Sequence, residues 1–290
     1  MDPTTSMYVA QGIHGLAYGM VLFLIASGLN VIFGMMGILN LAHGAFFMLS
    51  AYFCYQVLSI TESFWIALLL APIFTAFFGI LLEKFFLRKV HVMGHMGELI
   101  LTVGIAAIIM AVVKIFWGTE SLHIKIPPIL AGMVSIGGLD YPSYRLFMIG
   151  LAVVVMVIMS LLLYKTRLGK IVRAAVSDRD MVNALGINIP VVFMVVFGVG
   201  TWMAGVAGVA IAPILTVFPG LADQVGMDAF IVVVTGGFGS LLGAFIVSII
   251  FGLLSSYGIQ FLSQLAPVLI VGFMAIVLAI RPHGLFGVKE

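Results

Sequence analysis

The stretch Tyr8–Gly34, YVAQGIHGLAYGMVLFLIASGLNVIFG, decides the class of fold, because its 27 consecutive residues include no Asp, Glu, Lys or Arg. About 20 apolar residues are enough for a helix to cross a bilayer. The stretch belongs to a longer uncharged run over residues 3–61, and two further uncharged runs cover residues 181–222 and 229–280. The sequence therefore predicts an all-α polytopic membrane protein.

The composition of the whole chain agrees with this class. Only 8% of its 290 residues are charged, against roughly 25% in a soluble domain, while 63% are hydrophobic and the mean hydropathy is +1.28. A net charge of +2 provides no basic stripe for phosphates, so we expect no nucleic-acid partner. The one cysteine, Cys54, lies in an apolar run. It predicts no intrachain disulfide, and no metal motif accompanies it.

Charges, prolines and polar clusters divide the chain into nine candidate membrane helices, since a segment in lipid must satisfy its backbone groups internally. These are Tyr8–Gly34, His43–Leu58, Phe64–Phe86, Met96–Trp117, Tyr144–Tyr164, Pro190–Val217, Met227–Gly236, Leu241–Tyr257 and Leu262–Ile280. The seventh is too short to span a bilayer as a regular helix. We expect no signal peptide, because residues 1–7 have no basic residue.

Ten of the 13 basic residues lie in three loops, and this asymmetry predicts the orientation. They are Lys84, Arg88, Lys89, Lys165, Arg167, Lys170, Arg173, Arg179, Arg281 and Lys289. Placing these loops in the cytoplasm puts the N-terminus outside and the C-terminus inside. An even number of crossings must then follow residue 190, so we count Met227–Gly236 as a crossing that descends part-way. A re-entrant hairpin, giving eight crossings, is the alternative. Residues 1–290 form one transmembrane domain, with an external loop over 118–143 and a cytoplasmic loop over 165–189.

Two apolar segments are interrupted by glycines and small polar residues in comparable patterns. Residues 34–47 read GMMGILNLAHGAFF, and residues 235–245 read TGGFGSLLGAF. Such breaks expose helix ends to a water-filled cavity in transporters. They therefore predict a substrate pathway lined by Asn40, His43, Gly44, Thr235, Gly236, Gly237, Gly239 and Ser240. The alternative is a packing role, with glycines such as Gly15 and Gly19 allowing close helix contact and the polar side chains bonding between helices.

The sequence does not predict that this chain alone couples transport to an ion gradient, because no ionisable residue falls deep in a predicted span. Proton- or sodium-driven carriers usually bury carboxylates there. The loop 165–189 instead predicts a docking element. Ser177 with Asp180 resembles a capping box, Gly186 is a suitable residue to end the helix, and that short helix would present Met181, Val182, Ala184 and Leu185. The alternative is a loop whose basic residues only fix topology.

Five motifs spread over almost the whole chain resemble the LivH-type permease subunit of branched-chain amino acid ABC importers, within the larger family that includes ribose-type sugar permeases. They are Gly37–Gly44, the loop from Arg173 to Asp178 continuing through Ala184–Asn188, Ala204–Gly208, Gly236–Ser240 and Arg281–Gly287. Together they are highly specific. Val182 stands where alanine is common in the family, a conservative departure.

The resemblance implies a subunit of the bacterial inner membrane that pairs with a LivM-like permease, two LivG/LivF-like ATPases and a periplasmic substrate-binding protein. It places the ATPase contact on the loop residues Arg173, Ala174, Asp178, Met181, Ala184, Gly186 and Ile187. The chain has no Gly-x-x-x-x-Gly-Lys-Ser/Thr loop, so we expect no cofactor and no enzymatic activity here, with ATP hydrolysed by the partners. Relatives of this type are associated with branched-chain amino acids, and also with urea, short amides and carboxylates.

Two other classes stay open from the residues alone. A self-contained channel or secondary carrier would work without ATPases. An intramembrane serine hydrolase would need Ser240 as nucleophile and His43 as base, within about 2.6–3.2 Å of each other.

Overall fold

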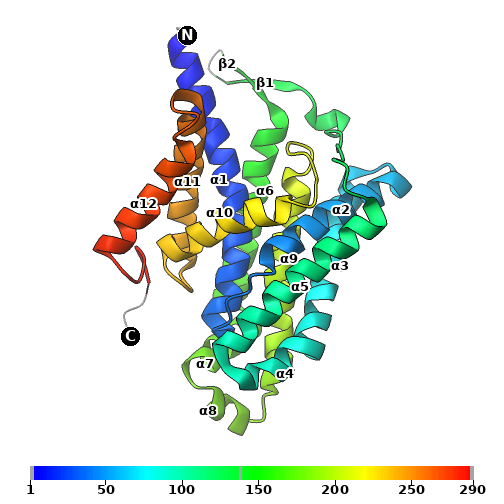
Figure 1. Ribbon diagram of the computed structural model, residues 1–290, viewed down its shortest axis with the longest axis vertical. Helices are drawn as coiled ribbons and strands as arrows, with labels where there is room; N and C mark the ends of the chain where they lie inside the picture. The colour runs from blue at the N-terminus through cyan, green and yellow to red at the C-terminus, as the bar shows by residue number, and fades with distance from the viewer. Residues whose placement is uncertain (1–2, 137–138, 288–290) are drawn as a thin grey trace.

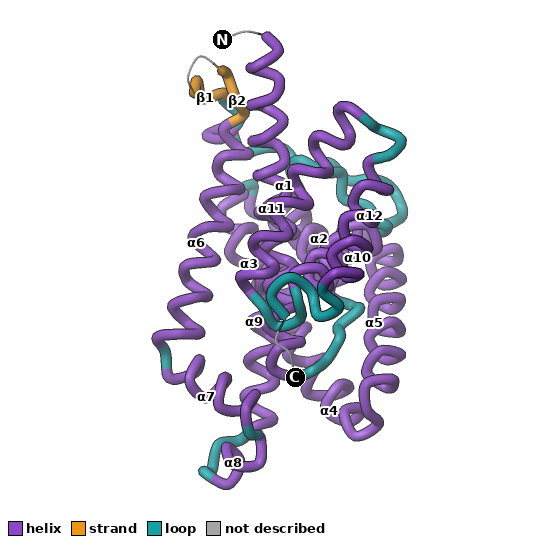
Figure 2. The backbone as a smooth tube through the Cα atoms, turned by 90° about the vertical axis from the view of Figure 1, so that its left-hand side faces the viewer, coloured by secondary structure: helices purple, strands orange, loops and turns teal. Residues whose placement is uncertain are grey.

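The computed structural model describes residues 3–136 and 139–287, and in this part of the chain it is a bundle of helices that run between two ends of the molecule (Figure 1). The N-terminal helix begins at the upper end, in the orientation of Figure 1. The last helix returns toward the lower half. A small two-stranded hairpin stands at the upper end, and two short helices form the lower tip (Figure 2).

The elements follow one another with short connections. They are α1 (Pro3–Met36), α2 (His43–Thr61), α3 (Phe64–Leu82), a π-helical turn (Glu83–Leu87), α4 (Arg88–Val90), a 3₁₀ turn (His91–Met93), α5 (Gly94–Trp117), a 3₁₀ turn (Pro128–Leu130), β1 (Met133–Ile136), β2 (Leu139–Pro142), α6 (Ser143–Lys165), α7 (Arg167–Ser177), α8 (Arg179–Ala184), α9 (Ile189–Ile211), α10 (Leu221–Gly236), α11 (Leu241–Phe261) and α12 (Ala266–Ile280). Strands β1 and β2 pair antiparallel, with Met133 opposite Pro142 and Ile136 opposite Leu139.

Seven of the described helices are long and apolar enough to cross a membrane, and each coincides with a predicted segment. Helix α12 has only 15 residues, and α10 has 16. The two largest boundary differences from the prediction are in α9 and α10. Helix α9 ends at Ile211 instead of Val217, because Pro213 has no backbone N–H with which to continue the helix. Helix α10 begins at Leu221, six residues before Met227, since its acidic residues lie within the helix and not in a loop.

Helix α10 lies across the middle of the bundle instead of parallel to the long helices (Figure 1), and Figure 2 shows it end-on at the same height. It then turns sharply into α11. A regular helix of 16 residues is about 24 Å long, less than the roughly 30 Å hydrocarbon core. A helix of this length is too short to span a bilayer as a regular helix.

The centre of the bundle is α1, which packs against α11, α9, α6 and α10. Glycines permit the closest of these contacts. A Cβ on Gly252 of α11 would lie 2.6 Å from the backbone nitrogen of Gly19, and a Cβ on Gly15 would lie 2.8 Å from the carbonyl oxygen of Gly252. Here the glycines have the packing role, as in other membrane helix pairs.

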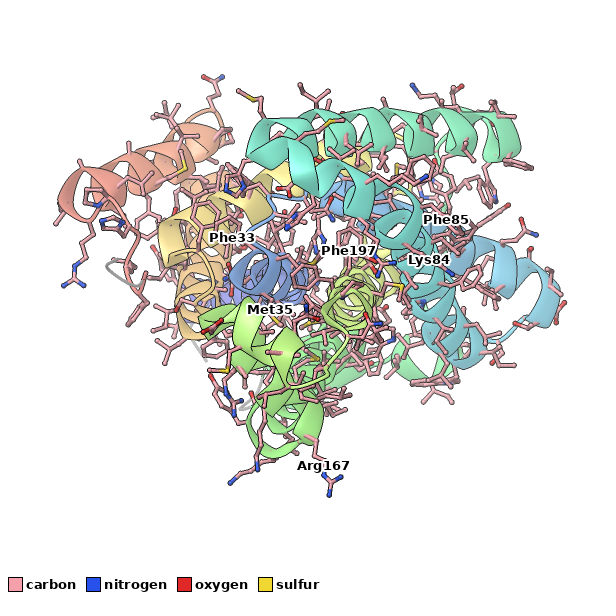
Figure 3. All side chains as sticks on the ribbon, turned by 90° about the horizontal axis from the view of Figure 1, so that it is seen from below. Phe33, Met35, Lys84, Phe85, Arg167 and Phe197 are labelled. Atoms are coloured by element: carbon pink, nitrogen blue, oxygen red, sulfur yellow. The ribbon has the colours of Figure 1, made fainter. Side chains whose placement is uncertain are left out.

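Charge is divided between the two ends of the molecule. The lower end, seen in Figure 3, carries Lys84 and Arg167 among its basic residues. At the other end, Glu62 caps α2 and Asp140 lies in the hairpin strand β2. Between the ends, α3, α5 and α12 expose large apolar side chains such as Leu69, Ile115 and Ile276. An apolar belt between two charged ends is the surface expected of a chain surrounded by lipid.

Candidate functional site

The first glycine break connects α1 to α2 by a short extended segment. Helix α1 stops at Met36, and Gly37 takes a positive φ of 71° that most side chains disfavour. The side chain of Asn40 then turns the backbone, because its Oδ1 accepts a hydrogen bond from the backbone N–H of Ala42 at 3.1 Å. Helix α2 begins at the next residue, His43, so both polar side chains sit at the break itself.

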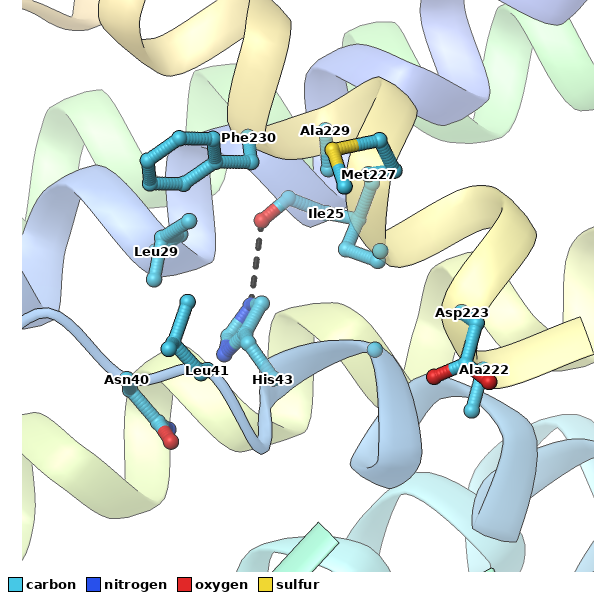
Figure 4. Close-up of a pocket in the computed structure, with 12 residues that line it drawn as sticks. Ile25, Leu29, Asn40, Leu41, His43, Ala222, Asp223, Met227, Ala229 and Phe230 are labelled. Atoms are coloured by element: carbon cyan, nitrogen blue, oxygen red, sulfur yellow. Dashed lines mark hydrogen bonds between the residues drawn. The ribbon is translucent and has the colours of Figure 1, made fainter. Parts of the chain in front are cut away.

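A pocket of about 380 Å³ opens between this break, α1 and α10 (Figure 4). Its volume lies within the range of small-ligand sites. The lining residues come from three elements far apart in sequence: Ile25, Leu29, Asn40, Leu41, His43, Gly44, Ala222, Asp223, Gly226, Met227, Ala229 and Phe230. Three of the predicted pathway residues, Asn40, His43 and Gly44, therefore line one cavity.

His43 and Asn40 line this pocket, and both side chains are almost fully buried. The His43 side chain is 3% exposed, and its Nε2 lies 3.0 Å from the carbonyl oxygen of Ile25. Its Nδ1 has no hydrogen-bond partner among the described residues, and neither has Nδ2 of Asn40, whose exposure is 2%. Buried polar atoms are normally paired. The two unpaired nitrogens at this helix break are therefore exceptions to that rule.

Gly44 allows α2 and α10 to pack closely at one wall of the pocket, because it has no side chain. A Cβ there would collide with the carbonyl oxygen of Ala222 and lie 2.8 Å from Cα of Gly226. Any larger side chain would push α10 away. This glycine has a packing role and lines the pocket at the same time.

The second glycine break occupies a different place, at the turn from α10 to α11. Gly237 and Gly239 have positive φ values of 100° and 77°. Ser240 caps α11, because its Oγ accepts a hydrogen bond from the backbone N–H of Gly243 at 3.0 Å. None of the five predicted residues of this break lines the pocket at His43. Ser240 and His43 bond to other groups, so the geometry gives no support to a serine–histidine pair.

The second break packs instead on the C-terminal tail and on α1. Backbone N–H groups of Leu285 and Phe286 donate to the carbonyl oxygens of Thr235 and Gly236 at 2.9 and 3.1 Å. A Cβ on Gly237 would lie 2.7 Å from Cα of Gly287. Thr235 is fully buried, and its hydroxyl has no hydrogen-bond partner in the described part of the chain.

Asn30, which no sequence pattern singled out, holds this turn in place. From α1, its Nδ2 donates to the carbonyl oxygen of Ser240 at 3.0 Å, and its Oδ1 accepts from the backbone N–H of Gly239 at 3.1 Å. The side chain is 1% exposed. Gly239 and Asn30 also line a second cavity of about 380 Å³, together with Tyr164 and Arg173 near the lower end. Sequence spacing gives no signal for a pair 210 residues apart.

We expect Asn30→Ala to loosen the turn between α10 and α11. It removes two hydrogen bonds to the backbone and leaves the N–H of Gly239 without this partner, while the carbonyl oxygen of Ser240 still accepts from Ala244; a hydrogen bond of this kind contributes about 0.5–1.5 kcal/mol. Thermal denaturation of the purified protein should therefore occur at a lower temperature. Asn40→Ala, which removes one hydrogen bond at the other break, is the control and should have a smaller effect. Equal melting temperatures for the wild type and Asn30→Ala would contradict this role for Asn30.

A partly buried acidic side chain lies on α10. Asp228 of α10 accepts a hydrogen bond from the hydroxyl of Tyr18 at 2.6 Å, and both side chains are partly buried. Helix α10 is not one of the seven helices long enough to span a membrane, so this residue does not test the expectation that no ionisable residue lies deep in a span. The hydrogen bond from the Tyr18 hydroxyl compensates the cost of burying the Asp228 carboxylate. Asp228 is the second residue of the predicted segment Met227–Gly236, and this position is the one sign of it in the sequence.

The predicted docking loop forms the lower tip of the molecule. Arg173 of α7 donates to the carbonyl oxygen of Leu163, and its guanidinium lies 5.4 Å from the ring centre of Tyr164. Ala174 is exposed on the same helix. The N-cap of α8 is Asp178, one residue after the predicted Ser177, because its extended backbone lets the carboxylate accept the N–H of Met181 at 2.9 Å.

Helix α8 ends as the sequence predicts. Gly186 has a positive φ of 82°, and the backbone N–H of Ile187 donates back to the carbonyl oxygen of Val182 at 3.3 Å. The exposed apolar surface consists of Met181, Ala184 and Leu185. Val182 does not belong to it, because this side chain is 3% exposed and turns into the interior.

Comparison with known proteins shows the family. Residues 13–280 match the family described as "Branched-chain amino acid transport system / permease component". The chain belongs to this permease family. The permease is 27% identical to the high-affinity branched-chain amino acid transport system permease protein BraD of Pseudomonas aeruginosa, covering 99% of this chain and 98% of that protein. It is 25% identical to LivH of Salmonella typhimurium and of Escherichia coli K12, covering 98% of this chain and 96% of each. No solved structure matches it.

This membership assigns the permease to a class. It is a multi-pass membrane component of an ABC importer and is not itself an enzyme. The family resemblance of the five motifs is thereby confirmed. ATP-driven import also requires ATPase and binding-protein partners, which this family implies.

Proposed function

We propose that the permease forms, with a second LivM-like permease, the membrane pathway for branched-chain amino acids or closely related small amino acids, amides or carboxylates. One observation carries the proposal. The pocket of Asn40 and His43 combines apolar walls with two unpaired buried nitrogens at a helix break. That combination suits a small molecule with one apolar part and one polar part. Two LivG/LivF-like ATPases and a periplasmic binding protein complete the importer.

The permease has nine membrane-crossing elements in this proposal, with the N-terminus outside and the C-terminus in the cytoplasm. Support comes from the charges, because basic residues gather near α4, α7 and α8 at one end of the bundle. Short cytoplasmic loops carry such an excess. Helix α10 counts as a partial crossing. The hairpin segment 118–143 is then external, and the loop 165–189 is cytoplasmic.

The ATPases contact the lower tip in this arrangement. Met181, Ala184 and Leu185 provide a small exposed apolar surface beside Arg173, while Asp178 and Gly186 fix the two ends of α8. Apolar residues on a short helix are suited to a groove on a partner. Ala174 and Ile187 flank this surface.

Gentle extraction of the tagged chain from its native membrane tests the proposal. We expect two ATPases and a second permease to co-purify in defined stoichiometry, identified by mass spectrometry. Reconstituted with the matching binding protein, the complex should take up branched-chain amino acids only when ATP is present. Recovery of the chain alone, with transport that needs no ATP, would overturn the proposal in favour of a carrier or channel.

A further inference from the structure

Two cavities between α6 and α11 join into one groove. The upper cavity, of about 340 Å³, is lined by α1, α6, α9 and α11, and the lower one is the cavity of about 380 Å³ that Asn30 and Arg173 line. Val31, Tyr164 and Leu241 line both cavities. Helix α1 packs against α6 and against α11, so it forms the floor between these two walls. We call the joined cavities the α6–α11 groove.

The upper part of the groove is apolar and open to the surface. Its larger lining side chains are Phe23, Met156, Met159, Met203, Leu242 and Phe245, and no charged residue is among the described residues that line it. Leu242 is 58% exposed at its edge. Methionine side chains adapt to flexible partners. This lining therefore suits a hydrocarbon chain from the lipid around the bundle.

The lower mouth of the groove carries a positive charge. Arg173 lines it, and the lining residues that the structure describes there include no acid. The Arg173 guanidinium donates to the carbonyl oxygen of Leu163 and lies 5.4 Å from the ring centre of Tyr164. These contacts hold the side chain at the mouth, and they leave some of its five N–H donors free. The free donors can bind an anion.

Helix α7 has the pattern of an interfacial helix. Its basic residues Arg167, Lys170 and Arg173 recur at every third position and so lie on one face, and the helix has no acidic residue. Val172 and Ala175 are buried. Figure 2 shows α7 running sideways below the lower end of α6. Amphipathic helices with a basic face lie at the level of the headgroups and attract anionic lipids.

We propose that the α6–α11 groove binds an anionic phospholipid of the cytoplasmic leaflet. The lipid phosphate accepts hydrogen bonds from Arg173, and one acyl chain lies along the upper part, against Met156 and Phe245. Tyr164 marks the boundary between the two parts, and tyrosine favours the interface between hydrocarbon and water. The inference goes beyond the proposed function and takes from it only the orientation, with α7 in the cytoplasm.

Native mass spectrometry of the full chain, released from detergent, tests the site with defined lipids. Phosphatidylglycerol is the anionic probe, and phosphatidylcholine with the same acyl chains is the zwitterionic reference. We expect the wild type to bind one phosphatidylglycerol at a concentration about fivefold lower than phosphatidylcholine. Arg173→Gln should remove this preference, since one basic residue near anionic headgroups has an effect of about that size. Arg173→Lys keeps the charge and should retain most of the preference.

Arg167→Gln is the matched control for the charge, because it removes one guanidinium from the same helix. Arg167 is not among the described residues that line the groove, and Figure 3 shows its side chain pointing away from the bundle. We expect it to change phosphatidylglycerol binding by less than about twofold. Ser160→Trp should fill the upper part and weaken the binding of both lipids. Ile158→Trp, at an exposed position of α6 outside the described lining, should weaken neither.

Four outcomes would overturn the lipid site. Equal binding of the two lipids by the wild type is the first, and an unchanged preference in Arg173→Gln is the second. Equal losses in Arg173→Gln and Arg167→Gln would assign the preference to the general charge of α7. Displacement of the lipid by soluble glycerol phosphate would show that phosphate alone is recognised. None of these results depends on transport, whereas the proposed function fails if the assembled importer shows no ATP-driven uptake of branched-chain amino acids.

Discussion

Gly186→Arg is expected to abolish uptake while the permease stays folded in the membrane. Gly186 has a φ of 82°, and a Cβ there would meet no atom within 4 Å. Arginine therefore costs only the strain of left-handed backbone, about 1–2 kcal/mol. Its long cationic side chain would project next to Met181 and Leu185, on the surface that we propose contacts the ATPases. Uptake into proteoliposomes and co-purification of the ATPases measure the effect.

Gly186→Asn is the matched control for this change. Asparagine tolerates positive φ better than most residues, and its side chain is short. We expect near-normal uptake and normal ATPase association for this variant. Normal uptake by Gly186→Arg would show that the tip of α8 is not the coupling contact. Loss of uptake in both variants would instead assign the effect to the backbone turn.

Gly237→Leu should prevent stable assembly of the permease. We expect this effect to be larger than any narrowing of a substrate pathway. At φ 100°, a non-glycine residue is strained by about 1–3 kcal/mol, and its Cβ would collide with the backbone of Gly287. The C-terminal tail would lose its place against Thr235 and Gly236. We expect a lower yield of complex, a lower melting temperature and no uptake. Size-exclusion chromatography and thermal denaturation measure the first two.

The same substitution at Gly104 is the control, because a Cβ on this α5 glycine meets nothing within 4 Å. Gly104→Leu should assemble and transport normally. Deleting residues 284–290 should make the effect of Gly237→Leu smaller than in the full chain, since both changes disturb one contact and contacting sites are not additive. A Gly237→Leu variant that assembles with normal stability and lacks only uptake would favour the pathway role predicted from the sequence.

These two glycines illustrate what local pattern does and does not predict. Gly186 was predicted as the end of a helix, and the structure confirms a positive φ there, because a helix terminus depends on residues within one turn. Gly237 was predicted to line a pathway with His43. The structure places it against Gly287, a contact that no spacing within the break could reveal.

The candidate site shows the same difference between local patterns and long-range contacts. Asn40, His43 and Gly44 were predicted as neighbours at one break, and all three line one pocket. Asp223 falls between the predicted segments Pro190–Val217 and Met227–Gly236, so the sequence predicted no helix there. In the structure it belongs to α10, and that helix supplies half of the pocket. A short helix lying across the bundle has too little length for a span signal.

The sequence by itself determined the helical membrane class, the boundaries of most spans, the charge difference between the two ends and the family. These properties depend on the length of apolar runs and on local composition, which neighbouring residues fix. Only the tertiary structure decided which helix ends meet. Asn30 bonds to Gly239 and Ser240, and the pocket joins Ile25 to Asp223. Such pairs arise from packing between segments about 200 residues apart, where shape complementarity of whole helices selects the partners.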